Sequence, residues 1–244
     1  MVNRHDQIMT PVLAIYGEYG EDEFELLGKY LKPGMTVLDI GANIGTHAIA
    51  FAEMVTDTGC VLCFEPMMYN FHLLCANIAM NGSQRIYPHR MIVGDHDDDY
   101  ARLPQIDGKQ RRNFGMYKAL KEVRGQGIPT PIVTIDSLDM TRCDLIKIDV
   151  EGSEFEVLDG ARETIEEFSP VIQAECNEDD KESAARLLPF FREMGYKTYW
   201  SYNRLHRPNN YKCSKTEKTG RDRNIIAVRT RLPQLTEGLE PCSQ

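Results

Sequence analysis

The sequence predicts an α/β fold in which a doubly wound, mostly parallel sheet carries an antiparallel strand near its C-terminal end. First, short apolar runs, such as residues 37–40 and 145–148, alternate with stretches whose apolar residues recur at helical spacing. That alternation is typical of parallel strands joined by crossover helices. Second, a glycine turn from Gly41 to Gly45 directly follows the first apolar run. Third, two late strands with no clear helix between them favour a terminal antiparallel hairpin.

Each element is assigned from its periodicity and its end signals. Asp22 is a candidate N-cap for the first helix, whereas residues 1–20 show no regular pattern. Strands are expected at residues 35–40, 60–64, 85–93, 144–150, 170–174, 196–202 and 224–228. Helices are expected at residues 22–31, 44–55, 68–80, 151–168 with a bend at Gly160, and 178–189, where Pro189 must kink or end the last one.

The chain is expected to form one large domain. Its 244 residues are 42% hydrophobic, which is enough for a sizeable core. The predicted organisation is an N-terminal cap segment and helix at 1–34, the main domain at 35–230 and a flexible tail at 231–244. Within the main domain, residues 96–130 break the rhythm of strands and helices and are predicted to be an insertion.

The insertion is locally basic. Between residues 101 and 125, seven lysines and arginines stand against Asp107 and Glu122, which leaves a charge of +5. A second basic stretch lies at 204–223. Neither stretch fits the sheet rhythm, and long irregular loops often carry function, so we expect both on the substrate side. A solvated surface loop is the alternative for the insertion.

Composition limits the partners and the location. The net charge of -9 and the pI of about 5.2 argue against general binding to nucleic acid or anionic membranes. Residues 1–7 lack the apolar core of a signal peptide, and no apolar run approaches the roughly 18–20 residues of a membrane span. We therefore expect a cytoplasmic protein with no membrane span.

Seven cysteines are scattered along the chain, and the CxxC pair Cys60 and Cys63 is interpreted as core thiols.

The glycine turn places backbone N–H groups and a helix N-terminus where open α/β sheets bind ligands. Asp39 lies inside the apolar strand just before this turn, and an unpaired carboxylate would be costly to bury there. A dinucleotide site wants G-x-G-x-x-G, but Asn43 occupies the position of the central glycine. An NAD-linked oxidoreductase is therefore the less favoured alternative.

S-adenosylmethionine suits these residues better, because it has no phosphate. Asp39 would hold its ammonium side, directly or through water, and the N–H groups of the turn suit its carboxylate. Glu65 ends the second strand, 26 residues after Asp39, and its carboxylate can accept hydrogen bonds from both ribose hydroxyls. A carboxylate at that place also serves NAD, so Glu65 alone does not discriminate between the two cofactors.

Four motifs, in this order, resemble the FkbM family of S-adenosylmethionine-dependent methyltransferases. They are Val-Leu-Asp-Ile-Gly-Ala-Asn-Ile-Gly at 37–45, Phe-Glu-Pro at 64–66, Thr-Ile-Asp-Ser-Leu at 134–138 and Asp-Leu-Ile-Lys-Ile-Asp-Val-Glu-Gly-Ser-Glu at 144–154. The resemblance runs from about residue 16 to residue 228. It implies a seven-stranded, Rossmann-like class I methyltransferase fold and O-methylation, often of hydroxyls on sugars, glycans or secondary metabolites. It also implies cofactor-binding residues: Asp39, Gly41, Asn43 and Gly45 at the methionine end, Glu65 at the ribose, and Gly94 with Asp95 at the adenine.

Two carboxylates are candidates for catalysis. The strand at 144–150 is expected beside the first strand, so Asp149 and Glu151 would emerge near the transferred methyl group. An alcohol acceptor needs a base, and close carboxylates can have separated pKa values. The alternatives are an acidic helix N-terminus or a divalent cation site, for which no third ligand can be placed.

His47 is interpreted as a solvated first-turn residue. A methyltransferase-like module that binds the nucleoside without catalysis is the remaining alternative.

Overall fold

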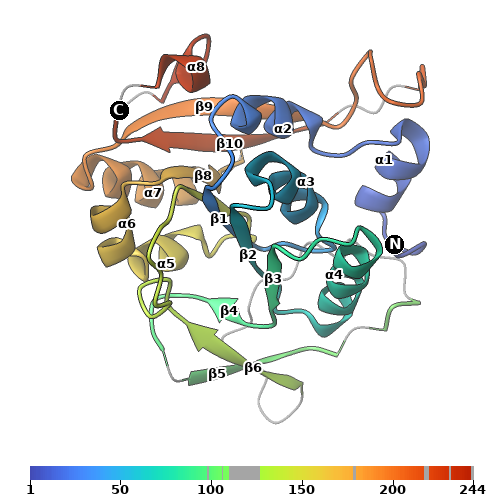
Figure 1. Cartoon of the computed structure of the whole chain (residues 1–244), viewed down its shortest axis with the longest axis horizontal. Coiled ribbons are helices and arrows are strands. Elements are labelled where there is room, and N and C mark those ends of the chain that lie inside the picture. Colours follow the sequence, from blue (N-terminus) through green and yellow to red (C-terminus); the bar gives the residue numbers. More distant parts are fainter. Residues whose placement is uncertain are drawn as a thin grey trace.

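A computed structural model describes residues 1–97, 99–105, 107–109, 127–177, 180–216, 220–230 and 232–242. Its centre is an eight-stranded sheet in the order β11-β9-β10-β8-β7-β1-β2-β3 (Figure 1). The five strands from β8 to β3 are parallel, and β10 is antiparallel to both of its neighbours. The prediction of a mostly parallel α/β sheet with an antiparallel strand near the C-terminus is confirmed. Strand β11 is additional to the seven strands that the resemblance implies.

The sequence-predicted elements are present, most with bounds shifted by a few residues. The strands of the large sheet are β1 (Thr36–Ile40), β2 (Cys60–Phe64), β3 (Ile86–His89), β7 (Leu145–Ile148), β8 (Val171–Glu175), β9 (Lys197–Arg204), β10 (Arg221–Val228) and β11 (Glu240–Pro241). The helices are α1 (Met9–Tyr16), α2 (Glu21–Gly28), α3 (Thr46–Val55), α4 (Met68–Met80), α5 (Glu154–Asp159), α6 (Arg162–Phe168), α7 (Lys181–Glu193) and α8 (Pro233–Thr236). Pro189 lies inside α7 and does not end it.

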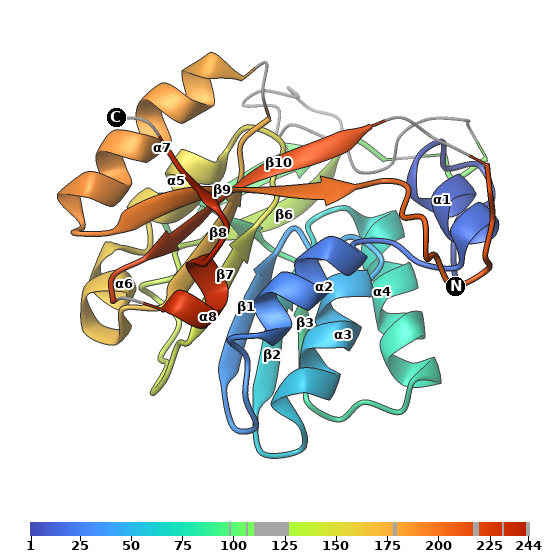
Figure 2. The ribbon, with the colours of Figure 1, turned by 90° about the horizontal axis from the view of Figure 1, so that it is seen from above.

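Helices cover both faces of the large sheet (Figure 2). Helices α2, α3 and α4 pack on one face, where Leu27, Phe51 and Leu74 are fully buried. Helices α5, α6 and α7 pack on the other face around buried residues such as Leu158 and Phe191. Strands that are buried on both faces consist almost entirely of apolar residues. This explains why β1 and β7 are easy to recognise in the sequence.

The predicted third strand is divided between two sheets. Strand β3 ends at His89, and β4 (Ile92–Val93) joins a second, three-stranded sheet with β6 (Ile128–Val133) and β5 (Asp99–Leu103). The expectation that the insertion at 96–130 is an irregular loop is therefore wrong for β5 and for the start of β6. Four of the five residues of β5 are exposed or half-buried, so no apolar run marks it in the sequence. Residues 98, 106 and 110–126 lie outside the described residues.

Both ends of the chain contain regular structure that the sequence pattern does not reveal. Helix α1 begins where the Asp6 carboxylate accepts a hydrogen bond from the backbone N–H of Thr10 at 2.7 Å, and it ends at Gly17 in the left-handed conformation. In the described part of the expected tail, α8 precedes β11, which pairs with β9. No helix in the described ranges is long and apolar enough to cross a membrane.

Candidate active site

A pocket of about 390 Å³ opens at the carboxyl ends of β1, β2, β7 and β8. Its walls also include the second sheet, the chain before α2, and single residues near the C-terminus. Open α/β sheets bind their ligands at this edge. Of the sequence-predicted site residues, the structure brings five to the wall of this pocket: Gly41, Asn43, Glu65, Asp149 and Glu151.

The glycine turn allows two strand ends to meet. Gly41 has φ 86°, and a Cβ there would lie 1.9 Å from the carbonyl oxygen of Asp149. Only glycine tolerates both the left-handed backbone and this approach. Gly45 has φ 91° and directly precedes α3; a Cβ on it would lie 2.7 Å from Leu74 Cδ1. Gly45 therefore contributes by packing α3 onto α4, behind the lining of the pocket.

The Glu65 carboxylate is held by the backbone on both sides. Its Oε2 accepts a hydrogen bond from the N–H of Asn43 at 3.0 Å, and its Oε1 accepts one from the N–H of Met67 at 2.8 Å. The side chain is 5% exposed, and burial raises its pKa to about 8 although these N–H groups act in the opposite direction. The structure thus keeps a fixed carboxyl group on the pocket wall. The backbone N–H of Asn43 is engaged by this contact with Glu65.

Asp39 lies behind the pocket, where Lys147 compensates its charge. Strands β1 and β7 pair with Asp39 opposite Lys147, and Lys147 Nζ lies 3.5 Å from Asp39 Oδ1. Asp39 is fully buried, and its side-chain oxygens have no hydrogen-bond partner among the described residues. Sequence reasoning missed Lys147, although a lysine within an apolar strand is as unusual as Asp39 itself. The strand register was the missing information.

Lys147 also contacts Asp149, which faces the pocket. Lys147 Nζ donates a hydrogen bond to Asp149 Oδ2 at 3.2 Å, and the Asp149 side chain is 44% exposed. Burial opposes the charge of Lys147, but the carboxylates of Asp149 and Asp39 outweigh it and raise the lysine's pKa. Burial would raise the pKa of Asp149, but Lys147 and His47 outweigh it and lower that pKa. Asp149 is therefore a carboxylate at neutral pH.

Glu175, the last residue of β8, is a pocket residue to which sequence reasoning assigned no role. It lines the pocket together with Asp149, and the two residues follow level positions of the neighbouring strands β7 and β8. Burial, and then the charges of Asp149 and Glu151, raise the pKa of Glu175. The pocket thus contains two carboxyl groups whose pKa values move in opposite directions, which is typical of acid–base sites.

Glu151 lies in a tight turn after β7. Its φ is 55°, an uncommon conformation for a residue with a side chain, and Gly152 follows with φ 93°. The Glu154 carboxylate closes the turn by accepting a hydrogen bond from the Gly152 N–H at 2.9 Å. Glu151 lines the pocket beside Asp149, as predicted. The pocket therefore has two carboxylates within three residues of one strand end.

His47 is not a solvated residue, so its interpretation was wrong. It is 7% exposed, and its Nε2 lies 2.5 Å from Glu23 Oε2 on α2. Glu23 is itself buried and accepts hydrogen bonds from Gln173 and Asn224. A buried carboxylate requires such partners, and α2 brings Glu23 to His47 across 24 residues of sequence. His47 also lines the pocket.

The structure does not bring Gly94 and Asp95 to this pocket. Asp95 is exposed, and its Oδ1 lies 2.6 Å from His96 Nδ1. Gly94 packs against α5, since a Cβ on Gly160 would lie 2.0 Å from the Gly94 carbonyl oxygen. At this end, the described part of the pocket wall is apolar and consists of Phe64, Met91, Ile92, Val93 and Leu103.

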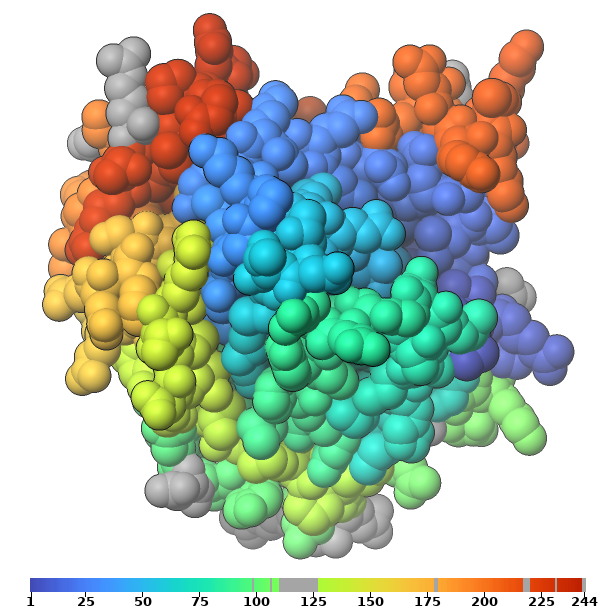
Figure 3. Space-filling model, in the orientation of Figure 1, coloured from blue at the N-terminus to red at the C-terminus, as the bar shows by residue number. Residues whose placement is uncertain are grey.

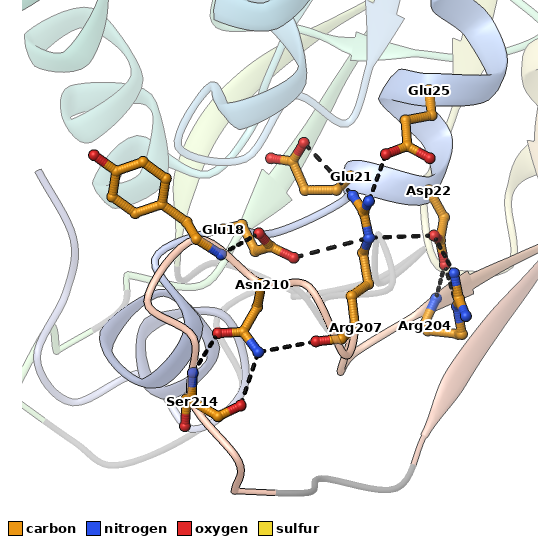
Figure 4. A network of polar contacts seen from close by, with 9 residues as sticks. Glu18, Glu21, Asp22, Glu25, Arg204, Arg207, Asn210 and Ser214 are labelled. Carbon is orange, nitrogen blue, oxygen red and sulfur yellow. Dashed lines mark hydrogen bonds and ion pairs between the residues drawn. The ribbon is translucent and has the colours of Figure 1, made fainter.

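At the start of the basic stretch 204–223, acidic side chains of the same protein neutralise the arginines. The Arg204 guanidinium binds the Asp22 carboxylate at 2.8 Å (Figure 4). Arg207 lies among four acidic residues of the chain from Glu18 to Glu25, and it bonds Glu25 most closely (Figure 4). The loop after β9 lies beside the N-terminal region (Figure 3), where the N–H groups of Tyr211 and Lys212 donate to Glu18 and to the carbonyl of Tyr16. These two arginines are therefore engaged and do not form a free cationic surface.

The comparison with protein families assigns the chain to one of them. Residues 39–198, more than half of the chain, match the methyltransferase FkbM domain. The chain therefore belongs to the FkbM methyltransferase family.

Two curated proteins are similar to this chain. One is the hexuronic acid methyltransferase AglP of Haloferax volcanii, with 24% identity over 155 residues that cover 62% of this chain and 60% of that protein. The other is the 31-O-demethyl-FK506 methyltransferase FkbM of Streptomyces tacrolimicus, with 30% identity over 164 residues that cover 56% and 63%. The match spans about three fifths of the length of each relative.

Solved structures support the fold. An FkbM methyltransferase from Methylobacillus flagellatus superposes with a TM-score of 0.54 at 19% identity, covering 80% of this chain and 43% of that one. Precorrin-6y C5,15-methyltransferase from Geobacter metallireducens gives 0.55 at 12% identity, covering 86% of both chains. The protein has the class I methyltransferase fold that the sequence predicts.

Proposed function

We propose that this chain transfers a methyl group from S-adenosylmethionine to a hydroxyl oxygen of a sugar or another small molecule. The observation that carries the proposal is the carboxylate of Asp149, exposed in the pocket directly beside the glycine turn. Family membership supports methyl transfer, and the names of the two curated relatives support a hydroxyl-bearing or sugar acceptor.

The residues of the pocket fit S-adenosylmethionine. The Glu65 carboxyl group, fixed by two N–H groups, suits a ribose diol, and the apolar wall near Val93 suits a purine. Gly41 keeps the backbone bare where the methionine portion would lie. Asp39 does not line the pocket, and its carboxylate would influence the bound cofactor only through its ion pair with Lys147. When bound, this cofactor supplies an electrophilic methyl group on a sulfonium.

Asp149 would take up the proton of the acceptor. The alkylated oxygen becomes strongly acidic as its bond to carbon forms, so even a carboxylate with a lowered pKa serves as the base. Lys147 keeps Asp149 charged and oriented, and one face of Asp149 remains open to the pocket. Positioning the hydroxyl supplies much of the remaining rate acceleration, because the leaving group is already good. Glu151 is the competing base, since it lines the same wall.

Calorimetry tests the cofactor. S-adenosylhomocysteine is expected to bind and NAD is not. Glu65→Ala is expected to weaken binding by about 1–3 kcal/mol, as for the loss of two hydrogen bonds to the ribose. Glu182→Gln, an exposed change on α7, is the matched control. Binding of NAD alone would make an oxidoreductase the better proposal.

A screen of sugars and small alcohols with a labelled methyl donor tests the reaction. If Asp149 is the base, Asp149→Asn lowers turnover by about 10²–10⁴-fold while cofactor affinity stays within a few-fold. Glu151→Gln tests the competing assignment in the same assay. Near-normal turnover by Asp149→Asn together with a loss in Glu151→Gln shows that Glu151 is the base. Cofactor binding with no acceptor in the whole screen favours a non-catalytic module.

A further inference from the structure

Glu175 lies level with Asp149 at the edge of the sheet. Strands β7 and β8 are parallel neighbours, and their register pairs Ile148 with Ala174. The next residue on each strand is Asp149 on β7 and Glu175 on β8. Both residues line the pocket. The two strands therefore present a pair of carboxyl groups to the space where an acceptor would bind.

Two carboxyl groups at neighbouring positions favour a shared proton. If both were ionised they would repel each other, whereas a protonated member can donate a hydrogen bond to the other. Lys147 Nζ donates to Asp149 Oδ2 at 3.2 Å, which favours the charged form of Asp149. The proton is therefore assigned to Glu175. The opposite pKa directions of the two groups agree with this assignment.

A second layer orients Glu175. Asn177 Nδ2 donates to Glu175 Oε1 at 2.6 Å. The backbone N–H of Arg223 on β10 donates to Asn177 Oδ1 at 3.4 Å, which fixes the direction of the amide group. Glu175 Oε1 thus acts as an acceptor, which leaves the other oxygen of Glu175 to carry the proton. Hydrogen bonds therefore connect β10 to Glu175 through Asn177.

We propose that Glu175 is a positioning residue for methyl transfer, whose protonated carboxyl group holds the Asp149 carboxylate toward the acceptor hydroxyl. The inference rests on the proposed function, in which Asp149 takes up the hydroxyl proton. As the oxygen–carbon bond forms and the sulfur–carbon bond breaks, the proton moves from the acceptor to Asp149. The proton on Glu175 stays in place. The pair then holds two protons and returns one to solvent from the open side of Asp149.

The pair lies in a strongly charged environment, which sets its pH response. The other titratable groups that face it from the surrounding elements are Tyr19, Glu23, Asp39, His47, Lys147, Glu151, Glu154 and Asp222. Above the raised pKa of Glu175, two carboxylates would repel each other and Asp149 would lose its position. Turnover is therefore expected to fall at alkaline pH in the wild type.

Two substitutions of Glu175 distinguish a role in positioning Asp149 from a role in the stability of the fold. Glu175→Gln keeps an oxygen for Asn177 and a donor for Asp149, whereas Glu175→Ala removes both. Glu175→Ala is expected to lower kcat by roughly 10–100-fold, the scale of a small misplacement of a catalytic group. KM and the affinity for S-adenosylhomocysteine should stay within a few-fold. Glu175→Gln should recover most of the lost kcat and lack the alkaline fall. Glu182→Gln on the exposed side of α7 is the control.

Carboxyl carbon NMR of the free protein provides a readout that needs no acceptor. In protein labelled at glutamate side-chain carboxyls, the resonance that Glu175→Gln removes should titrate well above the ordinary glutamate range. Titration in the ordinary range overturns the proposal, as does full activity of Glu175→Ala or equal losses in both variants. A wild type that fails to bind S-adenosylhomocysteine or to transfer methyl refutes the proposed function instead, and the NMR titration still decides whether the pair exists.

Discussion

Removing the positive charge of Lys147 is expected to destabilise the protein strongly. Lys147 is 3% exposed, and its Nζ lies 3.5 Å from the fully buried Asp39 and 3.2 Å from Asp149. Lys147→Met keeps the length of the side chain and leaves the Asp39 carboxylate without compensation. Breaking a buried ion pair in this way costs about 3–5 kcal/mol. Because Asp149 is open to the pocket, Asp39 accounts for most of this cost.

The double variant Asp39→Asn/Lys147→Met tests the cause. Replacing both partners of a buried pair is often close to neutral, so the double variant should recover about 2–3 kcal/mol of the single loss. Urea unfolding at pH 7 measures these free energies. The fluorescence of Trp200 on β9, the single tryptophan of the chain, reports the transition. A loss below about 1 kcal/mol for Lys147→Met, or additive losses in the double variant, would falsify the assignment of Lys147 as the partner of Asp39.

Two further predictions concern the cofactor side of the pocket. Gly41→Ala should leave little folded protein in a thermal melt, because its Cβ would lie 1.9 Å from the carbonyl oxygen of Asp149 at a φ of 86°. A normal melt would contradict the close approach of β1 and β7. Glu65 has a pKa raised by burial from 4.5 to about 8, so the folded state binds its proton more tightly and stability falls as pH rises between these values. Glu65→Gln should lose this part of the pH dependence in melting curves, and an unchanged profile would show that Glu65 is ionised throughout.

The sequence predicted the fold because the strands at its centre are buried on both faces. Strands β1 and β7 are mostly apolar, with Asp39 and Lys147 as exceptions, and the helices between the strands show clear periodicity. Strand β5 escaped prediction because four of its five residues are exposed or half-buried. Helix α1 escaped because its eight residues are too few to show a stripe, and its start depends on the side chain of Asp6.

The site was predictable only in part, for a related reason. Gly41, Glu65 and Asp149 stand at strand ends, and a strand end can be located from the sequence alone. The partnerships of Lys147 and Glu175 depend on which strands are neighbours and on their register. Periodicity carries no information about either. His47 was misjudged for the same reason, because its partner Glu23 comes from another helix.

The network around Glu23 has a consequence for how the protein is made. Glu23 lies near the start of the chain, yet the two residues that donate to its Oε1, Gln173 and Asn224, follow it by 150 and 201 residues. During synthesis, α2 therefore carries a carboxylate that cannot be buried with all its partners until β10 has been translated. Contacts this distant in sequence form late. A nascent chain that stops before β10 would lack Asn224, a partner of Glu23, and Asp222, which lines the pocket, so its pocket would remain unfinished.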